Sequence, residues 1–286
     1  MHPLSFIPMK QWVAVVHLPP LPGSPLYEGP LSAIVDRAVE EARRLTEAGA
    51  WAVLLENFGD RPFYRRRVPP ITVAVMAHAA GQVVTRVGCR LGISMLRNDA
   101  LSGLAVAAAV GGTFIRVNVL TGVVVTDQGL ISGPAATLLR YRRYWSASHV
   151  EVWADFRVKH GHPLVERPIE DELADLLERG LADAVIVSGP RTGQAPDPTG
   201  VQAVRRAVPE AVLWLGSGAT PENVVDYLPF VDGVIVGSYL REDGVAGRPL
   251  DPRRVERWVR AWQTSSPSES SGSLPLRTRP SRSGGS

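Results

Sequence analysis

The sequence predicts a single (β/α)8 TIM barrel of the α/β class, and three observations carry the prediction. Eight short segments rich in apolar and β-branched residues recur along the 286 residues. Each is followed by a longer stretch with helical spacing of apolar residues, which is the alternation expected of parallel strands and crossover helices. The strand segments are too continuously apolar for a sheet with one face in water. Eight parallel strands buried on both faces close as a barrel.

The predicted strands are, in chain order, Val13–Leu18, Ala52–Asn57, Arg90–Leu96, Phe114–Val119, Val150–Phe156, Ala184–Ser188, Val212–Gly216 and Gly233–Gly237. The predicted helices that follow them are Leu31–Ala48, Ile71–Arg86, Asp99–Val110, Pro134–Trp145, Ile169–Arg179, Thr199–Val208, Pro221–Leu228 and Pro252–Gln263. Pro134, Pro221 and Pro252 suit the first turn of a helix, and Thr220 and Asp251 are placed to cap the last two. A doubly wound open sheet is the alternative, but no G-x-G-x-x-G turn follows the first strand.

The chain is expected to divide into one barrel domain, residues 1–263, and a C-terminal tail, residues 264–286. The tail is rich in Ser, Gly, Pro and Arg, so it has little to bury and is predicted to be disordered. It also carries much of the +3 net charge, which leaves the barrel close to neutral. The basic run Arg65–Arg67 is interpreted as a solvated loop, and no nucleic-acid partner is predicted.

Cysteine content and apolar run lengths bear on where the protein works. The one cysteine, Cys89, excludes an internal disulfide and fits a reducing compartment. No apolar run approaches the roughly 20 residues that a membrane-spanning helix needs. We therefore expect a cytoplasmic protein without a transmembrane segment. Peripheral attachment to a membrane and formation of a homo-oligomer are left open.

Polar residues lie at or after the end of every predicted strand, where barrel enzymes build their active sites. In strand order they are His17; Glu56 and Asn57; Arg97 and Asn98; Asn118; Asp155, Lys159 and His160; Ser188, Thr192 and Gly193; Gly216, Ser217 and Gly218; Gly237 and Ser238. One polar residue after a strand is an ordinary cap or turn. Polar residues after all eight strands predict a shared binding pocket.

The last two units predict a phosphate site. Gly216-Ser217-Gly218 precedes a helix, and Gly237-Ser238 closes the last strand. Glycines there let backbone N–H groups approach an anion, and barrels commonly hold a phosphate between the loops after strands seven and eight. Plain tight turns are the alternative use of these glycines.

Lys159 stands out by residue type. Lysine and arginine total 31, yet only Lys10 and Lys159 are lysine. An amine can pair with substrate oxygens as a compact charge, or attack a carbonyl group in its neutral form. Because Lys159 is predicted to lie in a loop, charge pairing is favoured over a Schiff base. Lys159, Asp155, His160 and Glu56 are the candidate catalytic residues, with the carboxylates and the imidazole as acid and base.

A metal site is the other use of these side chains. His17, Glu56, Asp155, His160 and His162 could converge, but the spacing His160-x-His162 matches no ligand motif. No metal ligand is therefore assigned. Mg²⁺ is the natural choice of cofactor if carboxylates lie beside a phosphate. No serine-hydrolase pattern is present.

Eight motifs in chain order resemble the BtpA/SgcQ family, from about Val13 to Gln263. They are HLPPLPGSP from His17, ENFGD from Glu56, LRND from Leu96, FIRVNV from Phe114, DQG from Asp127, VKH from Val158, GSG from Gly216 and VGS from Val236. The sequence departs from the family pattern at Arg241, where a lysine is expected before an acidic-Gly turn.

The resemblance implies a TIM barrel related to the phosphate-binding barrels. It implies two different functions: biogenesis of photosystem I at the periphery of a membrane, and sugar or nucleoside metabolism. From the polar barrel mouth we expect an enzyme that acts on a phosphorylated sugar or nucleotide-like metabolite by lyase, isomerase or nucleosidase-type chemistry. The alternative is a non-catalytic assembly factor that binds partner proteins at a membrane surface. Its candidate surface is the amphipathic stretch Ala136–Trp145, with Arg140, Arg142 and Arg143.

Overall fold

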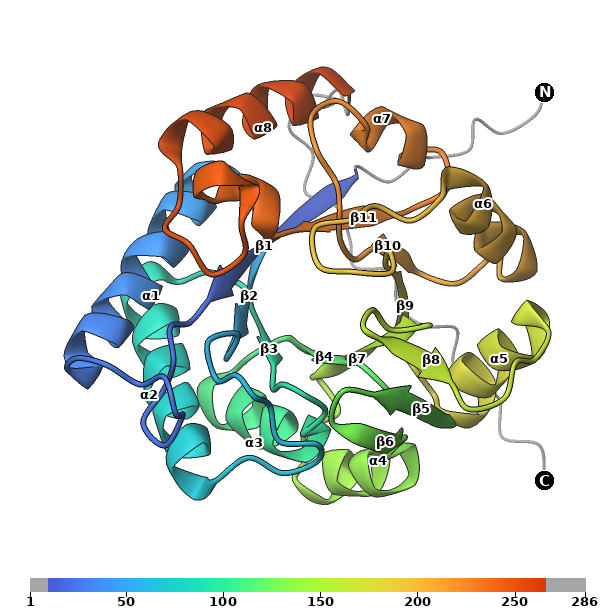
Figure 1. The fold of residues 1–286 in the computed structure, drawn as a ribbon, viewed down its shortest axis with the longest axis horizontal. Helices are drawn as coiled ribbons and strands as arrows, with labels where there is room; N and C mark the ends of the chain where they lie inside the picture. The colour runs from blue at the N-terminus through green and yellow to red at the C-terminus, as the bar shows by residue number, and fades with distance from the viewer. Residues whose placement is uncertain (1–9, 266–286) are drawn as a thin grey trace.

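The computed structural model describes residues 10–265, and these form a closed barrel of parallel strands inside a ring of helices (Figure 1). Around the barrel the strands are β1 (Gln11–His17), β2 (Ala52–Glu56), β3 (Leu91–Ser94), β4 (Phe114–Val117), β7 (Glu151–Phe156), β9 (Ala184–Val187), β10 (Leu213–Leu215) and β11 (Gly233–Val236). β11 pairs with β1, which closes the barrel. The predicted (β/α)8 fold is confirmed, and each predicted strand matches an observed one to within two residues at either end.

The surrounding helices are α1 (Leu31–Glu47), α2 (Pro70–Val87), α3 (Ala100–Val110), α4 (Ala135–Tyr144), α5 (Ile169–Ala174), α6 (Pro198–Ala207), α7 (Val224–Tyr227) and α8 (Pro252–Ser265). α5 continues into a π-helical turn, Asp175–Arg179. Within the described residues, no helix combines the length and apolarity that crossing a bilayer requires.

The start of α7 and the end of α8 differ from the prediction by more than one residue. α7 begins at Val224 and not at Pro221, because Asn223 accepts a hydrogen bond from the Thr220 amide at 2.8 Å and closes a turn there. The cap predicted at Asp251 is confirmed, since its Oδ1 accepts from the Arg253 amide at 2.9 Å. α8 runs to Ser265, two residues into the predicted tail. The rest of that tail, residues 266–286, lies outside the described residues.

The barrel interior is filled from its N-terminal end by aromatic rings. Phe114 stacks on Trp153 at a centroid distance of 3.9 Å, and Trp153 stacks on Trp214 at 4.5 Å. Gly92 and Gly233 make room for these rings, because a Cβ at either would lie within 2.4 Å of a ring atom. This packed layer leaves the space for a ligand at the opposite, C-terminal end of the strands.

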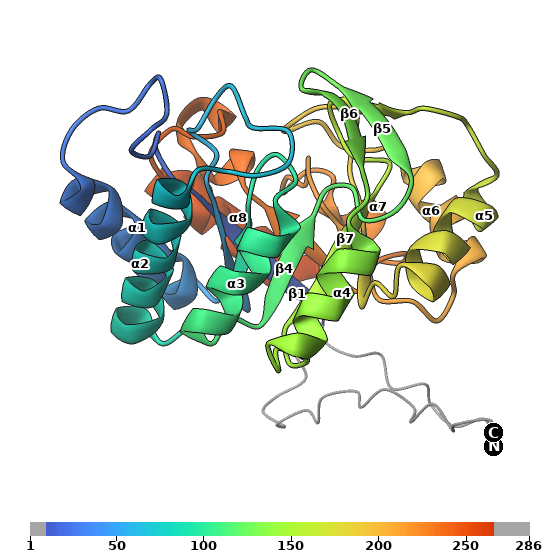
Figure 2. The same ribbon diagram turned by 90° about the horizontal axis from the view of Figure 1, so that it is seen from below.

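A small antiparallel sheet was missed by the sequence prediction. β5 (Val123–Thr126) and β6 (Gly129–Ser132) form a hairpin after β4, and β8 (Gly161–Pro163) from the loop after β7 pairs with β5. Figure 2 shows the β5–β6 hairpin rising at the same end of the barrel as the loops after β1 and β2. This sheet therefore forms one wall of the barrel mouth.

Candidate functional site at the barrel mouth

A cavity of about 1270 Å³ opens at the C-terminal ends of the strands. All but three of the predicted site residues line it, namely His17, Glu56, Arg97, Asn118, Lys159, His160, Ser188, Thr192, Gly193, Gly216, Ser217, Gly218, Gly237 and Ser238. The three exceptions are Asn57, Asn98 and Asp155. The structure thus brings together residues from all eight βα units in one pocket.

Asn57 and Asn98 use their amide groups to hold loops and not to face the cavity. Asn57 is fully buried, accepts from the Leu96 amide at 2.7 Å and donates to Asp60 at 3.1 Å. Asn98 exchanges two hydrogen bonds of 2.9 Å with the backbone of Val119. Their predicted role in ligand binding is therefore replaced by a role in shaping the loops after β2 and β3.

Asp155 is a buried counter-ion, which removes it from the candidate acids and bases. Arg116 donates to both of its oxygens, at 2.7 and 3.0 Å, and Asn118 donates to Oδ2 at 2.6 Å. Burial by itself raises the pKa of Asp155, but the charge and hydrogen bonds of Arg116 outweigh it and hold that pKa below the usual value. A carboxylate engaged in this way stays ionised and positions Arg116.

His17 and Glu56 lie side by side in the mouth. His17 Nε2 is 3.8 Å from Glu56 Oε2, and Ser94 donates to Glu56 Oε1 at 3.0 Å. Burial, helped by the charge of Arg241, lowers the pKa of His17 well below its ordinary value, so the ring is neutral at pH 7. Its Nδ1 is buried without a protein partner among the described residues. A neutral imidazole beside a carboxylate can transfer a proton.

The loop after β7 carries Lys159 and His160. Arg97 holds this loop by donating to the Lys159 carbonyl oxygen at 2.6 Å. His160 Nε2 accepts from the Thr192 amide at 3.2 Å, which joins the loops after β7 and β9. Burial lowers the pKa of His160, so the ring is neutral at pH 7.

The predicted phosphate residues gather between the loops after β9, β10 and β11. Gly218 has a φ of +78°, and a Cβ there would lie 2.1 Å from the Ala195 backbone, so only glycine lets the two loops pack. A Cβ at Gly193 would lie 3.4 Å from Ser238 Oγ. In the described part of the chain, the amides of Gly218, Ala219, Gly237 and Ser238 donate no hydrogen bond to protein. Free amides clustered with glycines form a site for an anion.

The cavity wall is strongly cationic. The charged residues that line it are Glu56 and Asp127 against Arg61, Arg97, Arg116, Arg157, Lys159, Arg191 and Arg254. Asp155 neutralises Arg116, and Glu172 pairs with Arg157 at 2.9 Å. The remaining surplus of positive charge favours an anionic ligand.

The five side chains considered for a metal do not form one ligand set, although His17, Glu56, His160 and His162 all line the mouth cavity. His162 lies exposed on β8, and Asp155 is occupied by Arg116. Nowhere in residues 10–265 do three His, Cys, Asp or Glu side chains gather as a metal would require.

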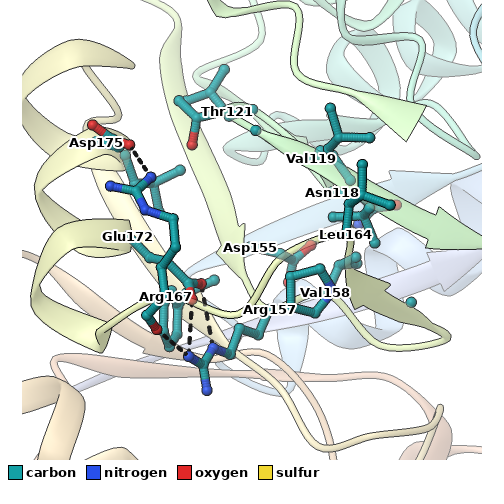
Figure 3. Close-up of a pocket in the computed structure, with 18 of the residues that line it drawn as sticks. Asn118, Val119, Thr121, Asp155, Arg157, Val158, Leu164, Arg167, Glu172 and Asp175 are labelled. Carbon is teal, nitrogen blue, oxygen red and sulfur yellow. Dashed lines mark hydrogen bonds and ion pairs between the residues drawn. The ribbon is translucent and has the colours of Figure 1, made fainter. Parts of the chain in front are cut away.

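A second cavity of about 280 Å³ lies beside the mouth, behind the small sheet (Figure 3). Its wall is mostly apolar, and Asn118, Arg157 and Val158 line both this cavity and the mouth. Two ion pairs, Arg157 with Glu172 and Arg167 with Asp175 at 2.5 Å, lie along its rim. These charges are satisfied by each other and hold α5 against the loop after β7.

Sequence reasoning missed Arg116, Arg191 and Arg254 in the mouth. Arg116 had a signal, because a charged residue inside the apolar strand segment FIRVNV needs a buried partner. Arg254 had no such signal in the sequence, because it lies on α8 and not at the end of a strand. Its guanidinium stacks over the ring of Tyr239, 5.0 Å from the ring centroid, beside the loop after β11. Only the closure of the barrel places it there.

Comparison with known proteins finds relatives that match most of this chain. The chain is 43% identical over 249 residues to the photosystem I biogenesis protein BtpA of Synechocystis sp., covering 87% of this chain and 86% of that protein. It is 42% identical to an uncharacterized protein of Methanocaldococcus jannaschii (88% and 96% covered) and 31% identical to an uncharacterized mitochondrial protein of Caenorhabditis elegans (86% and 90% covered).

Solved structures with the same fold include a thiamine phosphate pyrophosphorylase from Pyrococcus furiosus, with a TM-score of 0.54 and 14% identity over 90% of this chain and 96% of that one. An N-(5'-phosphoribosyl)anthranilate isomerase from the same organism has a TM-score of 0.52 and 17% identity, covering 89% and 99%. At such identities the likeness establishes the fold alone. The model of the BtpA family matches residues 9–264, and the chain belongs to the BtpA family.

Proposed function

We propose that this protein is an enzyme that acts on a phosphorylated sugar or nucleotide-like metabolite held in the barrel mouth. The observation that carries the proposal is the cluster of free backbone amides at Gly218, Ala219, Gly237 and Ser238, inside a cavity with surplus positive charge. A phosphate accepts several hydrogen bonds at once, so it matches unpaired amides held at fixed positions.

The chemistry of the remaining wall supports catalysis and not only binding. Glu56 and His17 form a carboxylate–imidazole pair, and Lys159 adds an amine to the wall of the same cavity. A cavity of about 1270 Å³ is also larger than a phosphate alone needs. These groups suit proton transfer at a sugar carbon or at a glycosidic bond, as lyases, isomerases and nucleosidases require.

Ser238→Asp is expected to abolish phosphate binding, whereas Ser238→Asn should weaken it modestly. The two side chains have nearly the same size, but the aspartate places a negative charge where the phosphate would sit. In thermal denaturation at constant ionic strength, inorganic phosphate and ribose 5-phosphate should stabilise the wild type by about 2–3 kcal/mol at 100 times Kd. The aspartate variant should show no such shift.

The aspartate and asparagine variants should unfold at similar temperatures without ligand, because residue 238 is only partly buried. Equal phosphate stabilisation of both variants would place the anion elsewhere. No stabilisation of the well-folded wild type by any phosphorylated compound would remove the proposal.

A second candidate function, attachment to a membrane surface as an assembly factor, is favoured by the outer face of α4. Tyr144 is 80% exposed and Tyr141 is 39% exposed, with Arg140 and Arg143 exposed beside them. Arg142 does not belong to this face, because it pairs with Asp183 at 2.9 Å. Exposed tyrosines with arginines are suited to the headgroup region of an anionic bilayer. The name of the Synechocystis relative gives this alternative its biological context.

Replacing both Arg143 and Tyr144 with serine is expected to weaken binding to phosphatidylserine-containing vesicles about tenfold, since one basic residue near such a surface contributes about 1 kcal/mol and the tyrosine adds to it. Cosedimentation with vesicles measures the effect. Arg206→Ser is the control, because Arg206 is exposed on α6. If wild type does not sediment with anionic vesicles, the α4 face is not a membrane contact.

A further inference from the structure

Lys159 carries an amine that the protein itself does not use. Its side chain is half-buried and lines the mouth cavity. In residues 10–265, Lys159 Nζ makes neither a hydrogen bond nor an ion pair, although Glu56 lies within electrostatic range. Lys10, the other lysine of the chain, donates from its Nζ to the Val231 carbonyl oxygen. The two lysines of this sequence therefore differ in whether their amines are free to react.

The backbone holds Lys159 in a constrained loop. Arg157 and His160, on either side of it, have φ angles of +52° and +56°. Non-glycine residues adopt this region rarely and persist there only where surrounding contacts impose it. Those contacts are the bond from Arg97 to the Lys159 carbonyl oxygen and the bond from the His160 amide to the Pro190 carbonyl oxygen at 3.1 Å. The amine is thus presented to the cavity from a fixed base.

The surroundings also shift the Lys159 amine toward its neutral form. Burial, together with the positive charge of Arg116, lowers the pKa of Lys159 from about 10.5 to about 8, and Glu56 and Asp155 oppose this only in part. At pH 7 about a tenth of such amines are neutral, which is roughly 300-fold more than for a lysine of ordinary pKa. A neutral amine is the form that attacks a carbonyl carbon.

We propose that Lys159 forms a Schiff base with the carbonyl group of an open-chain sugar phosphate. The amine nitrogen bonds to the carbonyl carbon, and the carbonyl oxygen leaves as water. The lysine ammonium and the carbonyl compound are thereby converted to a protonated imine and one water molecule, with no oxidant or reductant. Glu56 lines the same cavity and is the group we assign to proton transfer during loss of water. The inference that the substrate carries a phosphate rests on the function proposed above. The inference that the Lys159 amine is reactive does not.

Because the chain has only two lysines, reductive trapping gives an unusually clear test. The full-length protein is incubated with glyceraldehyde 3-phosphate and sodium cyanoborohydride, which reduces an imine to a stable secondary amine. Peptide mass spectrometry then compares Lys159 with Lys10 in the same molecule. We expect Lys159 to be labelled at least ten times faster than Lys10 at pH 7. The labelling rate of Lys159 should rise with pH and reach half its maximum near pH 8, as the ammonium loses its proton.

Two variants complete the test. Lys159→Arg keeps the positive charge but has no amine that can form an imine, so residue 159 should not be labelled. Lys10→Arg should leave the labelling of Lys159 unchanged. Equal labelling of Lys159 and Lys10 in the wild type would overturn the proposal, and this comparison does not depend on whether either variant folds.

A parallel experiment with unphosphorylated glyceraldehyde separates the two proposals. Selective labelling of Lys159 by both aldehydes, without competition by inorganic phosphate, would support the Schiff base and contradict the phosphate site. Stabilisation by phosphate without selective labelling would support the phosphate site and overturn the Schiff base.

Discussion

Replacing Asp155 with alanine is expected to lower the free energy of unfolding by about 3–5 kcal/mol. Arg116 is 6% exposed, and Asp155 is its anionic partner at 2.7 Å. Removing one member of a buried pair leaves the other charge without compensation in a medium of low polarity. Urea denaturation followed by tryptophan fluorescence measures the loss, because Trp153 lies on the same strand.

The control replaces both charges. The double variant Arg116→Met with Asp155→Leu should recover most of the stability, since apolar residues of similar volume need no counter-charge. A cost below about 1 kcal/mol for Asp155→Ala would show that Arg116 reaches solvent or another partner.

The same pair predicts how stability depends on pH. The pKa of Asp155 in the folded protein lies below its usual value. Its contribution is therefore fully present above the unfolded-state pKa of about 3.9 and is lost as the pH falls through the lower, folded-state value. The stability of the wild type relative to the double variant, which lacks both charges, should therefore fall in that acidic range and stay constant from pH 5 to 8.

Replacing Arg241 with methionine is expected to destabilise the protein by about 3 kcal/mol and to weaken phosphate binding. Arg241 is fully buried and donates to Glu41 on α1 at 2.5 Å and to the Val15 carbonyl oxygen on β1 at 2.6 Å. It anchors the segment after β11, which presents Gly237 and Ser238 to the cavity. The expected loss of stability is at the lower end of the range of about 3–5 kcal/mol for a broken buried ion pair. The reason is that Arg37 remains bound to Glu41 at 2.9 Å and still neutralises it.

The variant Arg241→Lys tests whether stability depends on the positive charge alone or also on the shape of the guanidinium. A lysine keeps the charge but cannot reproduce the fork that reaches two elements at once, so it should recover only part of the lost stability. Arg253→Met is the matched control: this arginine is exposed on α8, and its loss should change stability by less than about 0.5 kcal/mol. If Arg241→Met unfolds at the same urea concentration as Arg253→Met, the anchor does not contribute to stability.

Arg241 also resolves the one departure from the family pattern noted in the sequence. The lysine expected before the acidic-Gly turn is replaced by a residue whose planar head fits between α1 and β1. The sequence showed the substitution, but only the packing of α1 against the segment after β11 shows that the position is internal. A residue 200 positions from Glu41 gives no local signal of that contact.

The barrel could be predicted because its determinants are local. Each strand is a short apolar run and each helix has its own periodicity, and these depend on neighbours within about four residues. The small β5–β6–β8 sheet could not be predicted in the same way, because β8 has three residues and is defined by pairing with β5, 35 or more positions away. A strand of three residues such as β8 is too short to show a periodicity of its own.

For the candidate site, the sequence by itself determined the set of polar residues at the strand ends, the glycines of the last two units and the presence of a solitary amine at Lys159. Which of these groups remain available was decided only by the tertiary structure. Asp155 is neutralised by Arg116 from a neighbouring strand, and the side chains of Asn57 and Asn98 are hydrogen-bonded to backbone groups. Lys159 Nζ has no hydrogen-bond or ion-pair partner in the described chain. The physical reason is that availability depends on burial and on partners brought close by barrel closure, and neither property is encoded in any short stretch of sequence.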